Sequence, residues 1–175
     1  MSEAEEKKWY VARTRARQEK KIKMRLDALS VENYLPLRPE EHFYSNGRHK
    51  KIDVPLLPNL IFIRIEPAAR FALLSDFSNL FTHYVVDKFT GSSMVVPDRQ
   101  MQDFIRVIAT QDESIALEDM HLRKGDRVVV TGGVFKGIEG EFLTIKGRKK
   151  VLLRLEGLLA YSVEIPNQYL RKVGK

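Results

Sequence analysis

Residues 128–142 read VVVTGGVFKGIEGEF, and this stretch decides how the C-terminal part of the chain folds. A run of valines ends at two adjacent glycines, and two more glycines follow within seven residues. Each interior glycine costs a helix about 1 kcal/mol relative to alanine, whereas tight turns between strands favour glycine. The neighbouring runs RVVVT, GEFLTI, KVLLRL and AYSVEI are rich in β-branched and apolar residues. The glycine spacing and the β-branched runs therefore predict that residues 122–175 form a small β-barrel of about five short strands.

A phosphate-binding loop is the competing interpretation of these glycines. Such a loop needs Gly-x-x-x-x-Gly-Lys-Ser/Thr leading into a helix, because the helix N–H groups and the lysine together hold the phosphates. Here no Gly-Lys-Ser/Thr is present, and a strand is expected after the glycines. A dinucleotide fingerprint fails as well, since no crossover helix follows. We expect no nucleotide and no other cofactor.

Catalytic and metal-binding patterns are missing from the sequence. There is no cysteine and no Gly-x-Ser-x-Gly motif. The four histidines (His42, His49, His83 and His121) lack the spacing of zinc ligands. We therefore predict no catalytic residue and no metal site, and a protein that is not an enzyme.

The overall composition favours a globular binding protein. Of the 175 residues, 43% are hydrophobic and 30% are charged, and the formal net charge is +7. A basic protein favours acidic partners, with nucleic acid ahead of an anionic membrane. No apolar run reaches the ~18 residues of a membrane span, and the acidic N-terminus lacks a signal-peptide pattern. We expect a cytoplasmic, monomeric protein that does not enter a membrane.

Charge is distributed unevenly along the chain. Residues 111–121 contain four acidic side chains and no Lys or Arg, whereas residues 122–175 contain 12 basic and five acidic side chains. An acidic segment between two basic regions is typical of a linker. This predicts a first domain at 1–110, an acidic linker at 111–121 and a β-barrel domain at 122–175.

The first domain mixes strands and helices. Trp9–Arg13 is typical of a strand, and the next segment, TRARQEKKIKMRLDALS, has apolar residues at helical spacing and a basic exposed side. Asn46-Gly47 predicts a hairpin with a basic tip, which precedes an apolar strand at 60–65. Later segments predict two more helices, opened by Pro67 and Pro97, with a strand at 81–87 between them. This order favours an α+β domain with helices packed on a small antiparallel sheet.

Three motifs in this order resemble a known family. They are Trp9-Tyr10, the segment PLLPNLIF at 55–62, and GDRVVVTGGVFKGIEG at 125–140. Together they resemble the NusG family of transcription elongation factors, which implies an N-terminal NGN domain and a C-terminal SH3-like KOW β-barrel. The Pro58-Asn59 pair and the basic helix are similar to those of specialised paralogues of the RfaH and UpxY type. The resemblance thus implies an operon-specific antitermination factor.

The resemblance also implies partners and site residues. An apolar patch would bind the clamp helices of the RNA polymerase largest subunit, and basic side chains would face upstream or non-template DNA. The patch maps to Tyr10, Leu57, Leu60, Phe62 and Tyr84, and the basic set to Arg13, Arg15, Arg17, Arg48 and Lys50. The polar segment with which RfaH contacts the opposite side of the polymerase cleft is absent, and FALL at 71–74 takes its place.

In the KOW domain, Phe135 takes the place of an exposed loop aromatic that binds a small-subunit ribosomal protein or the termination factor Rho. A buried core residue is the alternative interpretation of Phe135. Gly140 matches the glycine of the KOW motif, at a position expected to exclude a Cβ atom. The rival function is a KOW-containing RNA-binding or ribosome-associated protein, which explains the basic barrel but leaves residues 55–62 without a role.

Overall fold

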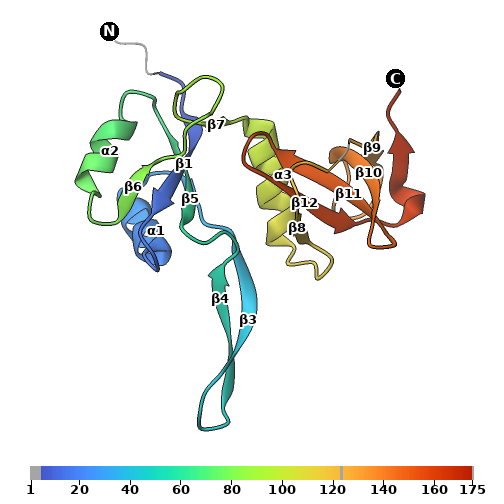
Figure 1. The fold of residues 1–175 in the computed structure, drawn as a ribbon, viewed down its shortest axis with the longest axis horizontal. Coiled ribbons are helices and arrows are strands. Elements are labelled where there is room, and N and C mark those ends of the chain that lie inside the picture. Colours follow the sequence, from blue (N-terminus) through green and yellow to red (C-terminus); the bar gives the residue numbers. More distant parts are fainter. Residues whose placement is uncertain (1–4, 123, 175) are drawn as a thin grey trace. The chain divides into compact units, whose positions relative to one another are not determined.

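The computed structural model describes residues 5–122 and 124–174 (Figure 1). The ends of both predicted domains, residues 1–4 and 175, and residue 123 lie outside the described residues. The chain divides into two compact units, with the boundary between Asp98 and Arg99. Both units contain antiparallel sheets together with helices, as the sequence predicts.

The N-terminal unit is built around one antiparallel sheet. Its strands are β1 (Lys8–Thr14), β2 (Asn33–Tyr34), β5 (Leu60–Ile65), β6 (Phe81–Tyr84) and β7 (Val95–Val96). They follow the order β2-β5-β1-β6, and β7 also pairs with β1. The central pair β1–β5 is buried on both faces, which explains why KWYVART and LIFIRI are almost continuously apolar.

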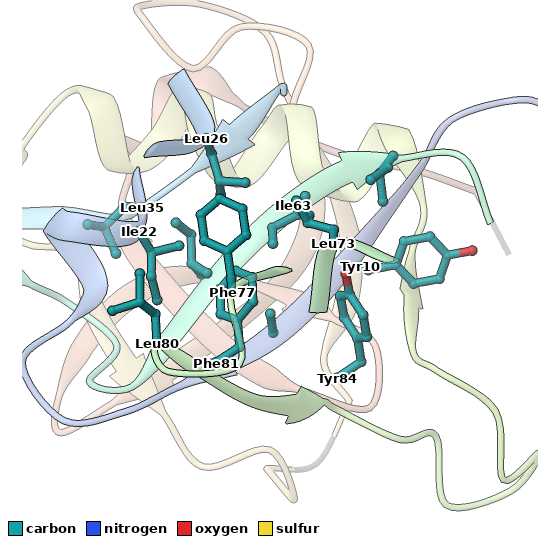
Figure 2. Close-up of a cluster of buried hydrophobic side chains, with 13 residues drawn as sticks. Tyr10, Ile22, Leu26, Leu35, Ile63, Leu73, Phe77, Leu80, Phe81 and Tyr84 are labelled. Carbon is teal, nitrogen blue, oxygen red and sulfur yellow. The ribbon is translucent and has the colours of Figure 1, made fainter. Parts of the chain in front are cut away.

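Two helices cover one face of this sheet. Helix α1 (Glu19–Ala28) buries Ile22 and Leu26, and helix α2 (Arg70–Asp76) buries Leu73 against the isoleucines of β5 (Figure 2). Both helices begin later than the sequence predicts. A turn with Arg17 at a φ of 61° delays α1 to Glu19, which leaves Ala16 exposed and outside the helix.

A two-stranded ribbon projects from the N-terminal unit (Figure 1). Strand β3 (Leu37–Phe43) pairs with β4 (His49–Pro55) in a separate sheet. The predicted Asn-Gly turn is confirmed: Gly47 has a φ of 78°, and the Asn46 side chain accepts a hydrogen bond from the Arg48 amide at 3.1 Å. Most of its side chains are exposed, so the ribbon adds nearly no core.

The C-terminal unit contains helix α3 (Asp98–Ala109) and a six-stranded antiparallel sheet. The sheet follows the order β13-β9-β10-β11-β12-β8. Five strands lie in residues 126–172, as the glycine spacing predicts: β9 (Asp126–Val130), β10 (Glu139–Ile145), β11 (Arg148–Leu155), β12 (Leu159–Glu164) and β13 (Leu170–Lys172). A 3₁₀ turn, Asn167–Tyr169, leads into β13.

The sixth strand corrects the prediction of a linker at 111–121. Residues Ala116–Glu118 form β8, which pairs with the edge of β12. Glu118 accepts a hydrogen bond from the Ser162 hydroxyl at 2.6 Å and lies 3.7 Å from the Lys150 ammonium. Both members of this ion pair are nearly buried, so Glu118 is a buried charge partner, whereas Asp112, Glu113 and Asp119 are exposed.

Helix α3 belongs to the compact C-terminal unit, whereas the sequence placed it in a first domain ending at 110. The Phe104 ring lies 5.1 Å from the ring of Tyr161 in β12, edge to face. The Gln100 side chain accepts a hydrogen bond from the Glu156 amide at 3.0 Å. These contacts could not be predicted, because they join residues more than 50 positions apart.

Candidate functional site

Tyr10 and Tyr84 form an aromatic pair at the helix-covered face of the N-terminal sheet (Figure 2). Their ring centroids lie 5.9 Å apart, and the Tyr84 hydroxyl donates to the Arg70 carbonyl at 2.8 Å. Burial raises the pKa of Tyr84 to about 12, in keeping with its hydroxyl lying among apolar side chains. The Arg70 guanidinium lies 5.3 Å from the Tyr10 ring and 4.2 Å from the ring of Phe71. Arg70 thus connects the buried pair to a ring that is 58% exposed.

Leu60 and Phe62 lie on the opposite face of the sheet. Ile61, Ile63 and Ile65 belong to the core beneath the helices, and side chains alternate along a strand. Phe62 is 0% exposed and Leu60 is buried, as is Leu57 in the loop before β5. The five residues predicted to bind polymerase are therefore all buried and do not form one exposed patch in this structure.

Three arginines without ion-pair partners surround the turn between β1 and α1. Arg13, Arg15 and Arg17 are exposed, and none of them forms an ion pair with any residue that the structure describes. The Arg15 side chain donates a hydrogen bond to the Ser78 carbonyl at 3.5 Å. Since no carboxylate neutralises them, these side chains are available to bind phosphate.

The Pro58-Asn59 motif holds this turn in place. Asn59 has a φ of 62°, a conformation that asparagine and glycine tolerate better than other residues. Its amide donates to the buried Glu19 carboxylate at 2.9 Å, and its carbonyl accepts from the Thr14 amide at 3.0 Å. The motif therefore fixes the start of α1 and the position of the arginines beside it.

Arg48 and Lys50, the other predicted basic residues, lie at the turn end of the β3–β4 ribbon. Both are exposed, and two exposed aromatic side chains, Phe43 and Tyr44, lie beside them. The basic set thus divides into a group at the β1–α1 turn and a group at the ribbon tip. Sequence reasoning identified the basic tip but missed its aromatic residues, although HFYSNGRHKK places rings directly beside the turn.

Phe135 is buried in the C-terminal unit, at variance with the exposed loop aromatic that the resemblance implies. Its neighbour Val134 is 67% exposed, and the Val134 carbonyl accepts a hydrogen bond from Arg106 of α3 at 2.7 Å. The alternative of a core residue therefore describes Phe135 in this structure, and the exposed apolar side chain of the loop is Val134.

Gly140 lies where strand β11 approaches closely. A Cβ atom there would lie 2.6 Å from Val151 Cγ1 and 2.7 Å from the Leu152 carbonyl oxygen. The expectation that this position excludes a Cβ is confirmed, and the reason is close strand packing rather than a positive φ.

A second surface was missed by sequence reasoning. A groove in the N-terminal unit combines exposed Phe71 with the aliphatic part of α2 and a basic side chain from the β1–α1 turn. Its lining residues are Arg15, Phe71, Leu74, Ser75, Ser78, Phe81 and Thr82. The signal in the sequence is FALL at 71–74, in which Leu73 is buried in the core while Phe71 faces solvent.

The part of the chain that the structure describes contains neither a metal-binding cluster nor a membrane-spanning helix. Residues 5–122 and 124–174 contain no group of three or more His, Asp or Glu side chains arranged to hold a metal ion. Among the same residues, no helix is both long and apolar enough to cross a membrane.

Comparison with known proteins assigns the fold. Over residues 7–105 the chain matches the family model described as transcription termination factor nusG. A solved structure showing the domain interaction in Thermotoga maritima NusG aligns with a TM-score of 0.52 and 19% identity, covering 96% of this chain and 98% of that one. Two crystal structures of the MjSpt4:Spt5 complex, in conformations A and B, align with TM-scores of only 0.30 and 0.29, at 16% and 17% identity over 95% of this chain and 99% and 97% of those chains. The family match spans more than half of the chain, and the chain therefore belongs to the NusG family.

Proposed function

We propose that this protein is a transcription elongation factor that binds RNA polymerase, suppresses pausing and promotes antitermination. The observation that carries the proposal is the family match over residues 7–105, which includes the whole sheet of the N-terminal unit with α1 and α2. The protein acts as a binding factor, in keeping with a family of transcription factors rather than enzymes.

The mechanism is a shift between two states of the polymerase. The N-terminal unit binds the clamp helices of the largest subunit and reaches across the cleft, so it binds the closed, elongating enzyme better than the open, paused one. A ligand shifts such an equilibrium only by its difference in affinity for the two states. A preference of about 1.4 kcal/mol for the closed state reduces the paused fraction relative to the active one about tenfold.

Docking draws on the apolar residues Tyr10, Leu57, Leu60, Phe62 and Tyr84. Direct contact through Leu60 and Phe62 requires a conformation in which their face of the sheet is exposed, because both are buried here. Phe71 needs no such change, since its ring is already exposed and is held by the Arg70 guanidinium. We therefore include Phe71 and its groove among the polymerase contacts.

The exposed arginines of the β1–α1 turn and the cations of the ribbon tip bind upstream or non-template DNA. Contacts of this kind give affinity that depends on salt and carry little sequence information. Replacing Arg13 and Arg17 with glutamine, and keeping Arg15 because it lines the groove with Phe71, is expected to reduce DNA binding and its salt dependence while leaving polymerase docking nearly unchanged. Loss of polymerase binding in this variant would contradict the division of roles.

The C-terminal unit is proposed to be a KOW domain. Its five strands between 126 and 172 and the steric requirement at Gly140 support this assignment. It would recruit a small-subunit ribosomal protein or Rho through the loop that contains Val134 and Phe135. The Pro58-Asn59 motif and the basic helix α1 favour a specialised, operon-specific factor of the RfaH or UpxY type.

A single-round transcription assay on a template with a strong pause site tests the function. Purified full-length protein, added to elongation complexes of bacterial RNA polymerase, is expected to shorten the pause lifetime in proportion to its occupancy. The matched control is Met24→Ala on the exposed side of α1, which should act as the wild type does. An unchanged or longer pause lifetime at saturating protein would refute the proposal.

A further inference from the structure

The tip of the β3–β4 ribbon differs from the rest of that ribbon in charge. Between His42 and Lys51 there are three cations (Arg48, Lys50 and Lys51) and no carboxylate. None of the three forms an ion pair with any residue in 5–122 or 124–174. The acidic side chains Glu40 and Asp53 lie nearer the base, where Arg38 pairs with Glu40 at 3.4 Å, and Glu41 lies directly opposite Lys51 at the edge of the tip. The positive charge is therefore concentrated at the end of the ribbon.

The same tip exposes flat side chains on both of its faces. By strand alternation, Phe43 and His49 lie on one face, and their ring centroids are 5.8 Å apart at an interplanar angle of 32°. His42 and Tyr44 lie on the other face, edge to face at 4.8 Å. Phe43 is 70% exposed, although burial in a core is the usual fate of a strand phenylalanine.

The turn holds these groups in a defined arrangement. The Tyr44 amide donates to the Arg48 carbonyl at 2.8 Å, and the Gly47 amide donates to the Tyr44 carbonyl at 3.0 Å. A shallow hollow beside the turn is lined by Tyr44, Asn46, Arg48, His49 and Lys50. Rings and cations at such a site match the two chemical parts of a nucleotide, because a base stacks on a ring and a phosphate pairs with a cation.

We propose that the ribbon tip, residues 42–51, binds unpaired nucleotides by stacking bases on Tyr44 and Phe43, one on each face, while Arg48 and Lys50 beside Tyr44 hold the phosphates. This deepens the nucleic-acid contact of the proposed function, since it selects single strands over duplex. In a duplex the base faces are stacked on one another and cannot reach a protein ring, so only the phosphate contacts remain. A second protein is a poorer occupant, because the tip has cations on both faces and no continuous apolar surface.

The test measures binding of the full-length protein to a fluorescent oligonucleotide of about 12 nucleotides, by anisotropy at about 50 mM salt. The single-stranded DNA, the RNA of the same sequence and the DNA duplex are compared. The double variant Phe43→Ala/Tyr44→Ala is expected to lose about tenfold or more in affinity for a single strand and to bind duplex as the wild type does. The DNA and RNA arms identify which strand the tip prefers.

Two further variants separate stacking from charge. Arg48→Gln/Lys50→Gln should lower the slope of log K against log salt by about 0.7 for each cation removed, whereas the ring variant should leave the slope unchanged. Phe89→Ala is the matched control, because Phe89 is 99% exposed in the same unit but lies outside the ribbon.

The proposal is overturned if wild-type protein binds no single strand, or if the ring variant binds single strands like the wild type or loses duplex affinity by the same factor. Free oligonucleotides contain no polymerase, so this result is independent of polymerase docking. A protein that passes this test and fails to bind polymerase would refute the proposed function alone.

Discussion

At the scale of single residues, the family motifs are explained by backbone geometry and close packing. Asn59 lies at a positive φ and its amide is held by Glu19, so the residue after Pro58 must tolerate a left-handed conformation. Gly140 has no such dihedral requirement and is needed because Val151 and Leu152 occupy the space of a Cβ. The residue types at these two motif positions are thus fixed by different physical requirements: backbone conformation at Asn59 and lack of space at Gly140.

Asn59 can be tested with a matched pair of substitutions. Asn59→Ala is expected to destabilise the protein by about 1 kcal/mol, because a Cβ-bearing residue without a polar side chain is strained at positive φ. Asn59→Gly should be neutral within a few tenths of that value, since glycine accepts this conformation and the bonding groups at 59 belong to the backbone. Urea denaturation of both variants provides the measurement, and equal stability of the two would contradict the account.

Gly140→Ala is expected to cost about 1–3 kcal/mol, because a backbone oxygen and a packed valine must move to admit the methyl group. Gly174→Ala is the control, as no atom lies within 4 Å of its added Cβ and its φ is not positive. Thermal unfolding followed by circular dichroism distinguishes them. Equal melting temperatures for Gly140→Ala and Gly174→Ala would contradict this prediction, because β11 would then have moved to admit the methyl group without loss of stability.

At the scale of elements, helix α3 contains a half-buried carboxyl group, Asp103, and the nearby arginines do not fully compensate the cost of burying its charge. The half-buried Asp103 has its pKa raised above the ordinary 3.8, chiefly by burial, although Arg99 and Arg106 act in the opposite direction. A carboxyl group with a raised pKa favours folding while it is protonated, and this contribution is lost as the pH rises through the folded pKa. At neutral pH the ionised group therefore lowers stability.

Asp103→Asn should consequently be more stable than the wild type at pH 7, and this advantage should shrink as the pH falls below about 4. Denaturation curves at several pH values between 3 and 7 would measure the difference. Asp112→Asn, in the turn after α3, controls for the general loss of one acidic charge. An advantage that is constant across this range, or one that grows in acid, would contradict the assigned cause.

The elements also show what the sequence can and cannot predict. Glycine spacing and β-branched runs predicted the five strands of 126–172, because turn chemistry is local. The strand β8 was taken for a linker, since Glu118 acquires its partners Lys150 and Ser162 only when the chain folds. Likewise, the sequence correctly placed Leu60 and Phe62 on a strand. A strand that is apolar on both faces can be buried on both or can expose one face to a partner, and the sequence pattern does not distinguish these cases.

At the scale of the whole molecule, the NusG family fold presents two exposed surfaces that are candidates for binding, both in the N-terminal unit. The N-terminal unit contains the groove with Phe71 and the unpaired arginines of the β1–α1 turn, and its ribbon adds a tip of rings and cations. The C-terminal unit contains the buried Phe135 and the exposed Val134. Partner binding is therefore expected to depend on the exposed rings of Phe71, Phe43 and Tyr44, which the resemblance did not point to, as well as on the basic residues that it implies.

Substitutions of exposed residues therefore report on partner binding more directly than substitutions of buried ones. Phe62→Ala would remove a fully buried ring and cost about 3–5 kcal/mol of folding free energy, so loss of function in that variant would not identify a contact. Phe71→Ala removes an exposed ring and should leave the fold intact. Met24→Ala, on exposed surface of α1, is its control.

The most direct test of the central claim is the affinity of the full-length protein for purified bacterial core RNA polymerase, compared among the wild type, Phe71→Ala and Met24→Ala. The account predicts saturable binding by the wild type and by Met24→Ala, and an affinity about tenfold lower for Phe71→Ala, as expected for an exposed aromatic that anchors an interface. Absence of wild-type binding would contradict the claim that this protein acts on RNA polymerase, and equal affinity of all three proteins would contradict the assigned surface.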